Sequence, residues 1–178
     1  MSTHISSEFA FRWRSRLGLA VALLLLYGAV NVLSALVVPL SLHLNGAGAV
    51  GGTLVLSQTA DSALLGRSLA ELHRADPRLG AFLVTFMDTM CAYMMAFALL
   101  EIGVVWFALR RGQAWALWTA AIASLAIFPY LAAIIRTYAR LGVPPGDLTF
   151  PVAFLVVIIV ATALGWFGLR QGSRAAIA

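Results

Sequence analysis

Four long apolar stretches, separated by short polar or glycine- and proline-rich segments, occupy most of the chain. They run over about residues 17–44, 80–109, 114–138 and 148–169. An apolar stretch of about 18 or more residues with few charges is long enough to cross the ~30 Å hydrocarbon core of a membrane as a helix. The pattern therefore predicts an all-α integral membrane protein with one domain, residues 1–178, folded as an antiparallel four-transmembrane-helix bundle.

The longest segment between two apolar stretches, residues 45–79, is expected to lie outside the membrane on the extracytoplasmic side. Its leucines Leu65, Leu69 and Leu72 recur at i, i+4 and i+7, which predicts a short amphipathic helix. Two placements of this helix remain open: on the membrane surface, or packed over the end of the bundle. Asp76, followed by a proline, is a typical start for the second apolar helix.

The charges are sparse and their positions indicate the topology. With 62% hydrophobic and 11% charged residues, the chain has too little polar surface to dissolve as a globule of its size. All its basic residues are arginines, and more of them flank the spans on one side than on the other, which predicts both termini in the cytoplasm of a bacterial inner membrane. Seven arginines are assigned to the cytoplasmic side (Arg12, Arg14, Arg16, Arg110, Arg111, Arg170, Arg174) and five to the other (Arg67, Arg74, Arg78, Arg136, Arg140).

Several chemistries are not expected of this sequence. The net charge of +5 belongs to the ends of apolar spans and to no basic helix with interleaved aromatic residues, so nucleic-acid binding is excluded. The single cysteine, Cys91, can form no internal disulfide. None of His4, His43 and His73 lies deep in a span, so the sequence predicts neither a haem nor a metal site and no other cofactor.

The segment Leu109–Trp118, which reads LRRGQAWALW, is compatible with a tight turn between two spans. It resembles the cytoplasmic hairpin of small, uncharacterised four-span bacterial membrane proteins, in which a basic-basic-glycine turn precedes a pair of tryptophans. The resemblance covers about ten residues and implies a topology, without an activity.

This hairpin also allows the depth of polar residues in the second and third spans to be compared. Residues equidistant from the turn should lie at similar depth, which brings Asp88 opposite about residue 135, with Arg136 as the nearest basic group. The sequence therefore predicts an ion pair between Asp88 and Arg136 at the outer membrane boundary. Registry of the hairpin is its expected role, and contact with a ligand is the alternative.

Glu101 lies eight residues before Leu109, or about 12 Å inside the cytoplasmic boundary. A carboxylate at that depth is costly, so it should face the bundle and gain hydrogen bonds, or keep its proton. Depth counting suggests an intramembrane polar cluster, whose members are Glu101, Tyr27, Asn31, Thr119, Ser124 and Thr162.

Three functions are compatible with these patterns. The first is a non-enzymatic accessory or assembly component whose partners are the lipid bilayer and other copies or subunits in a membrane complex. The second is a small proton-coupled transporter or channel subunit, acting as a homo-oligomer through Glu101. The third is a lipid-active membrane enzyme that uses Glu101 beside an apolar pocket containing Met90 and Met94. No catalytic residue pair is predicted.

Overall fold

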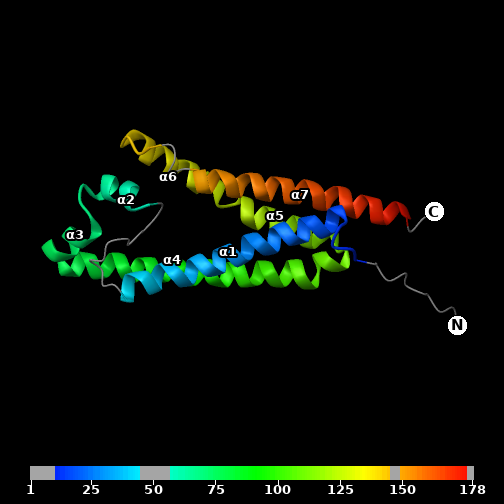
Figure 1. Ribbon diagram of the computed structural model, residues 1–178, viewed down its shortest axis with the longest axis horizontal. Helices are drawn as coiled ribbons and strands as arrows, with labels where there is room; N and C mark the ends of the chain where they lie inside the picture. Colours follow the sequence, from blue (N-terminus) through cyan, green and yellow to red (C-terminus); the bar gives the residue numbers. More distant parts are fainter. Residues whose placement is uncertain (1–10, 45–56, 145–148, 176–178) are drawn as a thin grey trace.

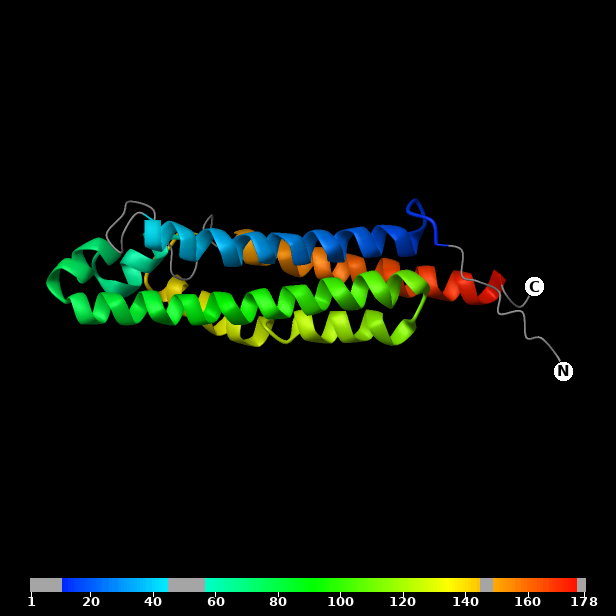
Figure 2. The same ribbon diagram turned by 90° about the horizontal axis from the view of Figure 1, so that it is seen from below.

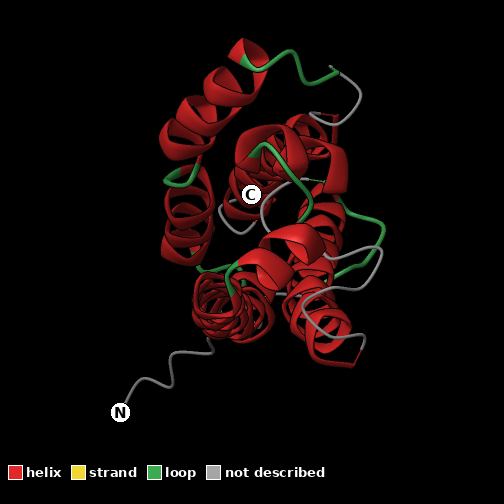
Figure 3. Ribbon diagram, turned by 90° about the vertical axis from the view of Figure 1, so that its left-hand side faces the viewer, coloured by secondary structure: helices red, strands yellow, loops and turns green. Residues whose placement is uncertain are grey.

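The computed structural model describes residues 11–44, 57–144 and 149–175, and every regular element in these ranges is helical (Figures 1 and 3). Four segments are long and apolar enough to cross a membrane: Arg16–Leu44, Pro77–Arg111, Ala114–Arg140 and Pro151–Gln171. The prediction of an all-helical fold with four apolar helices long enough to span a membrane is confirmed. The elements are α1 (Arg16–Leu44), α2 (Gln58–Leu65), α3 (Leu69–Ala75), α4 (Pro77–Phe107), η1 (Leu109–Arg111), α5 (Ala114–Leu125), α6 (Phe128–Arg140) and α7 (Thr149–Ala175).

Helix α4 begins where the sequence suggests a cap. The Asp76 side chain accepts hydrogen bonds from the backbone N–H groups of Arg78, at 3.0 Å, and Leu79, at 3.1 Å, and Pro77 stands in the first helical turn. The helix therefore starts three residues before the predicted limit of the apolar span at residue 80. The glycine-rich stretch that follows residue 45, and Asp147, a residue type suited to cap the last span, lie outside the described residues.

The polar segment contains two short helices where the sequence predicts one. Gly66 ends α2 with a φ of 69°, a left-handed conformation that favours glycine. Ser68 and Glu71 then form a capping box that starts α3 in a new direction. The leucines of α3, Leu69 and Leu72, pack against Leu42 of α1 and not on a separate surface. The prediction of a single amphipathic helix was therefore wrong, because the three leucines at i, i+4 and i+7 belong to two helices separated by a turn.

The third span is interrupted near its middle. Helix α5 ends at Leu125, and α6 starts at Phe128 with Pro129 in its first turn, because proline lacks the N–H that would continue the preceding helix. Pro129 therefore lies at a break between two helices. In Figure 1, α6 extends from α5 toward the end of the molecule where α2 and α3 lie.

The largest of the hydrophobic clusters lies at the end of the molecule that contains the start of α1. Figure 2 shows the amino-terminal end of α1 beside the carboxyl-terminal end of α4. Gly168 of α7 approaches α1 so closely that a Cβ atom there would lie 2.5 Å from the Leu17 backbone nitrogen. We call this region the four-helix core, and its fully buried members include Leu17, Val21, Leu24, Val105, Leu109, Ala116, Leu117 and Ala161.

At the other end, the packing separates into two clusters. One joins α1, α3 and α4 through Leu42, Leu69 and Leu72. The other joins α2 and α6 through Ala60 and Tyr138. Since α6 packs in a cluster different from that of α1 and α4, the third span leaves the four-helix core after α5.

Aromatic and basic side chains gather around the four-helix core. The guanidinium of Arg110 lies 4.4 Å from the Trp106 ring centroid, and that of Arg170 lies 4.1 Å from the Trp166 ring centroid. Trp118 packs edge-to-face against Trp166 at 5.4 Å. These contacts form an arginine–tryptophan collar at one end of the helices.

Candidate functional site

Glu101 is buried on α4 and its nearest polar partner comes from α5. The Ser124 hydroxyl donates a hydrogen bond to Glu101 Oε1 at 3.0 Å. The exposed fraction of Glu101 is 4% and that of Ser124 is 1%, so both are removed from the surface. The second carboxyl oxygen, Oε2, is buried with no hydrogen-bond partner within the described residues. An unsatisfied buried oxygen is costly, which marks this carboxyl as the most unusual group in the membrane-spanning part.

Helix α1 contributes the remaining groups of this site. Tyr27, Asn31 and Ser124 line the same cavity, and Tyr27 lies close enough to Glu101 for an electrostatic interaction. Asn31 also donates from Nδ2 to the Tyr27 backbone oxygen at 2.8 Å, which fixes its amide on the helix. We call Tyr27, Asn31, Glu101 and Ser124 the buried polar cluster. It joins α1, α4 and α5 at one level, and the structure brings together these four of the six residues suggested by depth counting.

The other two candidates lie elsewhere. Thr162 is partly buried, but its hydroxyl donates to the Ile158 backbone oxygen of its own helix at 2.7 Å. Thr119 is exposed. It precedes Ser124 by five residues, which turns it about 140° away around α5. Depth counting gives the level of a residue along a helix without giving the face it occupies.

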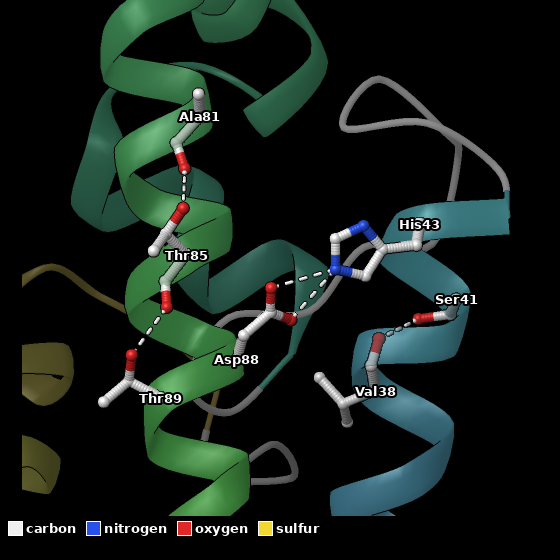
Figure 4. A network of polar contacts seen from close by, with 7 residues as sticks. All are labelled: Val38, Ser41, His43, Ala81, Thr85, Asp88 and Thr89. Atoms are coloured by element: carbon white, nitrogen blue, oxygen red, sulfur yellow. Dashed lines mark hydrogen bonds and ion pairs between the residues drawn. The ribbon is translucent and has the colours of Figure 1, made fainter.

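Asp88 has a partner other than Arg136. His43 Nε2 of α1 lies 2.9 Å from Asp88 Oδ2 and 3.1 Å from Oδ1, and donates to this carboxylate (Figure 4). Arg136 is exposed on α6, and no ion pair joins it to Asp88 within 4 Å in the structure. The depth comparison assumed an unbroken third helix beside α4. The break before α6 removes Arg136 from that neighbourhood, and the end of α1 takes its place.

The sequence reasoning missed a third polar contact. The Tyr138 hydroxyl of α6 donates to Asp61 Oδ1 of α2 at 3.0 Å. Asp61 is 5% exposed and Tyr138 is 1% exposed. In the sequence, Asp61 is one of several charged residues in the polar segment 45–79, and no pattern relates it to Tyr138.

Two cavities lie along α4, one on each side of Met90. The first, of about 400 Å³, adjoins the buried polar cluster. The second, also of about 400 Å³, reaches α2 and α6 and includes Asp61 in its wall. Met90 belongs to both walls. The first is lined by Tyr27, Asn31, Met90, Tyr93, Met94, Phe97, Ala123, Ser124 and Ile127, and the second by Asp61, Leu64, Leu65, Leu83, Phe86, Met87, Met90 and Ile134.

The fold and this site define a helical membrane protein with four apolar spans and a buried polar cluster between three of its helices. Within residues 11–44, 57–144 and 149–175, no group of three or more histidine, cysteine, aspartate or glutamate side chains is placed to hold a metal ion. No protein-family model, curated protein or solved structure matches the chain.

Proposed function

We propose that the protein is a non-enzymatic accessory or assembly component of the cell membrane. The observation that carries this proposal is that each notable polar pair joins two different helices. Glu101 and Ser124 join α4 to α5. His43 joins α1 to α4 through its aspartate partner, and Tyr138 joins α6 to α2. Polar contacts between membrane helices fix their packing and registry, which is what a scaffold requires.

The proposed topology is an antiparallel bundle with both termini in the cytoplasm and α2 and α3 on the opposite side of a bacterial inner membrane. The arginine–tryptophan collar supports this arrangement, because cationic and indole groups prefer the headgroup region and arginines are enriched on the cytoplasmic side. Seven of the twelve arginines would then be cytoplasmic.

A scaffold also needs a face on which partners assemble. Helix α1 exposes a row of large apolar side chains, of which Leu26, Leu33 and Val37 are each 59% exposed. Such a face fits lipid chains and equally fits the apolar helix of another copy or subunit. We therefore place the assembly surface on this side of α1, away from the buried polar cluster.

Photo-cross-linking in the native membrane tests the proposal. A photoreactive amino acid at Leu33 should give a discrete protein adduct of constant mass, whether with a second copy or another subunit. The matched control is the same substitution at Leu100 of α4, which is 71% exposed on another helix and should give mainly lipid adducts. Lipid adducts alone at both positions would contradict the assembly role.

A second function, that of a proton-coupled transporter or channel subunit, is favoured by one observation. Among the described residues, the buried Glu101 Oε2 has no hydrogen-bond partner, as is expected of a carboxyl group that binds and releases a proton or a substrate. In vesicles with an imposed pH gradient, Glu101→Gln would abolish proton flux if the chain transports. Equal proton permeability of the wild-type protein, the Glu101→Gln protein and empty vesicles would leave the scaffold function.

A further inference from the structure

We propose that the two cavities along α4 form one binding site for a long-chain amphiphile with an amine or hydroxyl head. The apolar tail would lie against Met90 and Phe97, and the head would lie beside Asp61. This inference goes beyond the scaffold function, since a scaffold needs no small-molecule ligand. It rests on the shape of the cavities, on their size and on Asp61, the charged residue among the described residues that line them.

The shape is that of an extended chain. The lining residues of α4 run from Leu83 to Phe97, a length of about 21 Å along the helix axis. Met87, Met90 and Met94 follow one another on this wall. Methionine side chains are flexible and polarizable, so they adapt to a mobile hydrocarbon chain.

The size of the cavities suits a lipid chain and is too small for a protein helix. Each cavity holds about 400 Å³. A membrane helix 10–12 Å wide and 30 Å long fills roughly 2,400–3,400 Å³. Cavities of several hundred Å³ are typical of small-molecule sites. The interruption between α5 and α6 creates the space, because a continuous third helix would remain with the four-helix core.

The charge indicates which end holds the head. Asp61 is buried in the wall of the cavity nearer α2, where its carboxylate accepts a hydrogen bond from Tyr138 and has at least one further interaction. A hydrogen-bond donor such as an ammonium or hydroxyl group complements it, whereas an anionic head is repelled. At the far end, Tyr27, Asn31 and Ser124 form the polar part of a wall that is otherwise mainly apolar.

Photolabelling of the full-length protein in phosphatidylcholine vesicles tests the site. The probe is a long-chain alkyl amine with a mid-chain diazirine, and the label is mapped by mass spectrometry. We expect label on the Met90–Phe97 segment, reduced about tenfold by Met90→Trp, which adds bulk where the two cavities meet. Leu100→Trp adds the same bulk on an exposed face of α4 and should change nothing. If Met90→Trp does not fold, Ile127→Trp serves instead, since Ile127 is 55% exposed and lines the cavity.

Two further experiments test which head group binds and whether the ligand is a membrane lipid or a soluble amphiphile. The matching carboxylic acid should label the same segment about tenfold less than the amine, and Asp61→Asn should remove that preference. Competition by phosphatidylethanolamine would identify a membrane lipid as the source, and competition by a free long-chain amine alone would identify a soluble amphiphile. Equal labelling of Met90 and of the exposed Leu100 would show bulk lipid only and overturn the proposal, as would chain-to-chain adducts in the cavities.

Discussion

His43 of α1 holds Asp88 of α4, with 2.9 Å between Nε2 and Oδ2. The pair lies at the end of α1 far from the four-helix core, where the side chains are 57% and 37% exposed (Figure 4). The hydroxyl groups of the neighbouring Thr85 and Thr89 donate to backbone oxygens of their own helix, so these hydrogens are not used to bind Asp88. The contact therefore fixes the registry of α1 against α4 at the end of α1 opposite to the close approach of Gly168 and Leu17.

Because both side chains are partly exposed, this contact should contribute little to stability. We expect a double-mutant cycle of His43→Gln and Asp88→Asn to give a coupling of about 0.2–1 kcal/mol in the free energy of unfolding, measured in detergent micelles. The control cycle pairs Asp88→Asn with Arg136→Gln and should give no coupling. Coupling with Arg136 and none with His43 would restore the pairing suggested by depth counting.

The hydrogen bond between Ser124 and Glu101 should matter more, because both residues are buried. Ser124→Ala leaves Glu101 Oε1 without its donor and should lower the free energy of unfolding by about 0.6–2 kcal/mol. Adding Glu101→Leu should recover part of that loss, since both polar partners are then gone. Thr119→Val, on the exposed face of the same helix, is the control and should be neutral. A larger loss of unfolding free energy for Thr119→Val than for Ser124→Ala would mean that Thr119, and not Ser124, faces the interior of the bundle.

The elements that could be predicted were those decided by a local pattern. Each apolar span exceeds the membrane thickness by itself, and Asp76 and Pro77 form a helix start without help from distant residues. The meeting of Glu101 with Ser124 was also within reach, since both lie at similar depth on either side of a short turn.

The remainder depends on helix direction and continuity, which the apolar pattern does not record. Thr119 matches Glu101 in depth but lies on the wrong face. Arg136 lies beyond a break that changes the path of the third span. The contact between Asp61 and Tyr138 links residues 77 positions apart, and no periodicity relates them. Contacts of this kind arise only when the whole chain is packed.

The capping box of α3 makes a prediction about pH outside the membrane. The Ser68 backbone N–H, and then its hydroxyl, donate to the Glu71 carboxylate and hold the pKa of Glu71 below its ordinary value of 4.5. A depressed folded-state pKa means that the cap stabilises α3 above about pH 4.5 and loses this effect as the pH falls through the folded pKa.

A carbon-13 titration of the Glu71 side chain measures this effect. The midpoint should lie below 4.5 in the wild-type protein and rise toward 4.5 in Ser68→Ala, which removes the hydroxyl donor. Ser62→Ala, in the adjacent α2, should leave the midpoint unchanged. A midpoint insensitive to Ser68→Ala would mean that the capping box does not form in solution.

Two glycines in apolar helices should respond in opposite ways to the same substitution. A Cβ on Gly168 meets the Leu17 backbone, whereas one on Gly103 meets nothing within 4 Å. We expect Gly168→Ala to lower the free energy of unfolding by about 1–3 kcal/mol, since backbone atoms cannot move aside easily. Gly103→Ala should be neutral or raise it by up to about 1 kcal/mol. Similar effects of both substitutions on thermal unfolding would show that α1 and α7 are not in close contact.

Tyr138→Phe should release α2 from α6 without disturbing the spans. The phenol hydroxyl is the group that binds Asp61, and its loss leaves a buried carboxylate with one hydrogen bond fewer. Trypsin cleavage after the exposed Arg67, just beyond the end of α2, should then become about 5–10 times faster, because local opening of α2 costs about 1–1.4 kcal/mol less. Tyr130→Phe removes a hydroxyl from the 74% exposed ring of the same helix and should leave the rate unchanged. Equal rates for both variants would mean that the hydrogen bond from Tyr138 to Asp61 does not hold α2 in place.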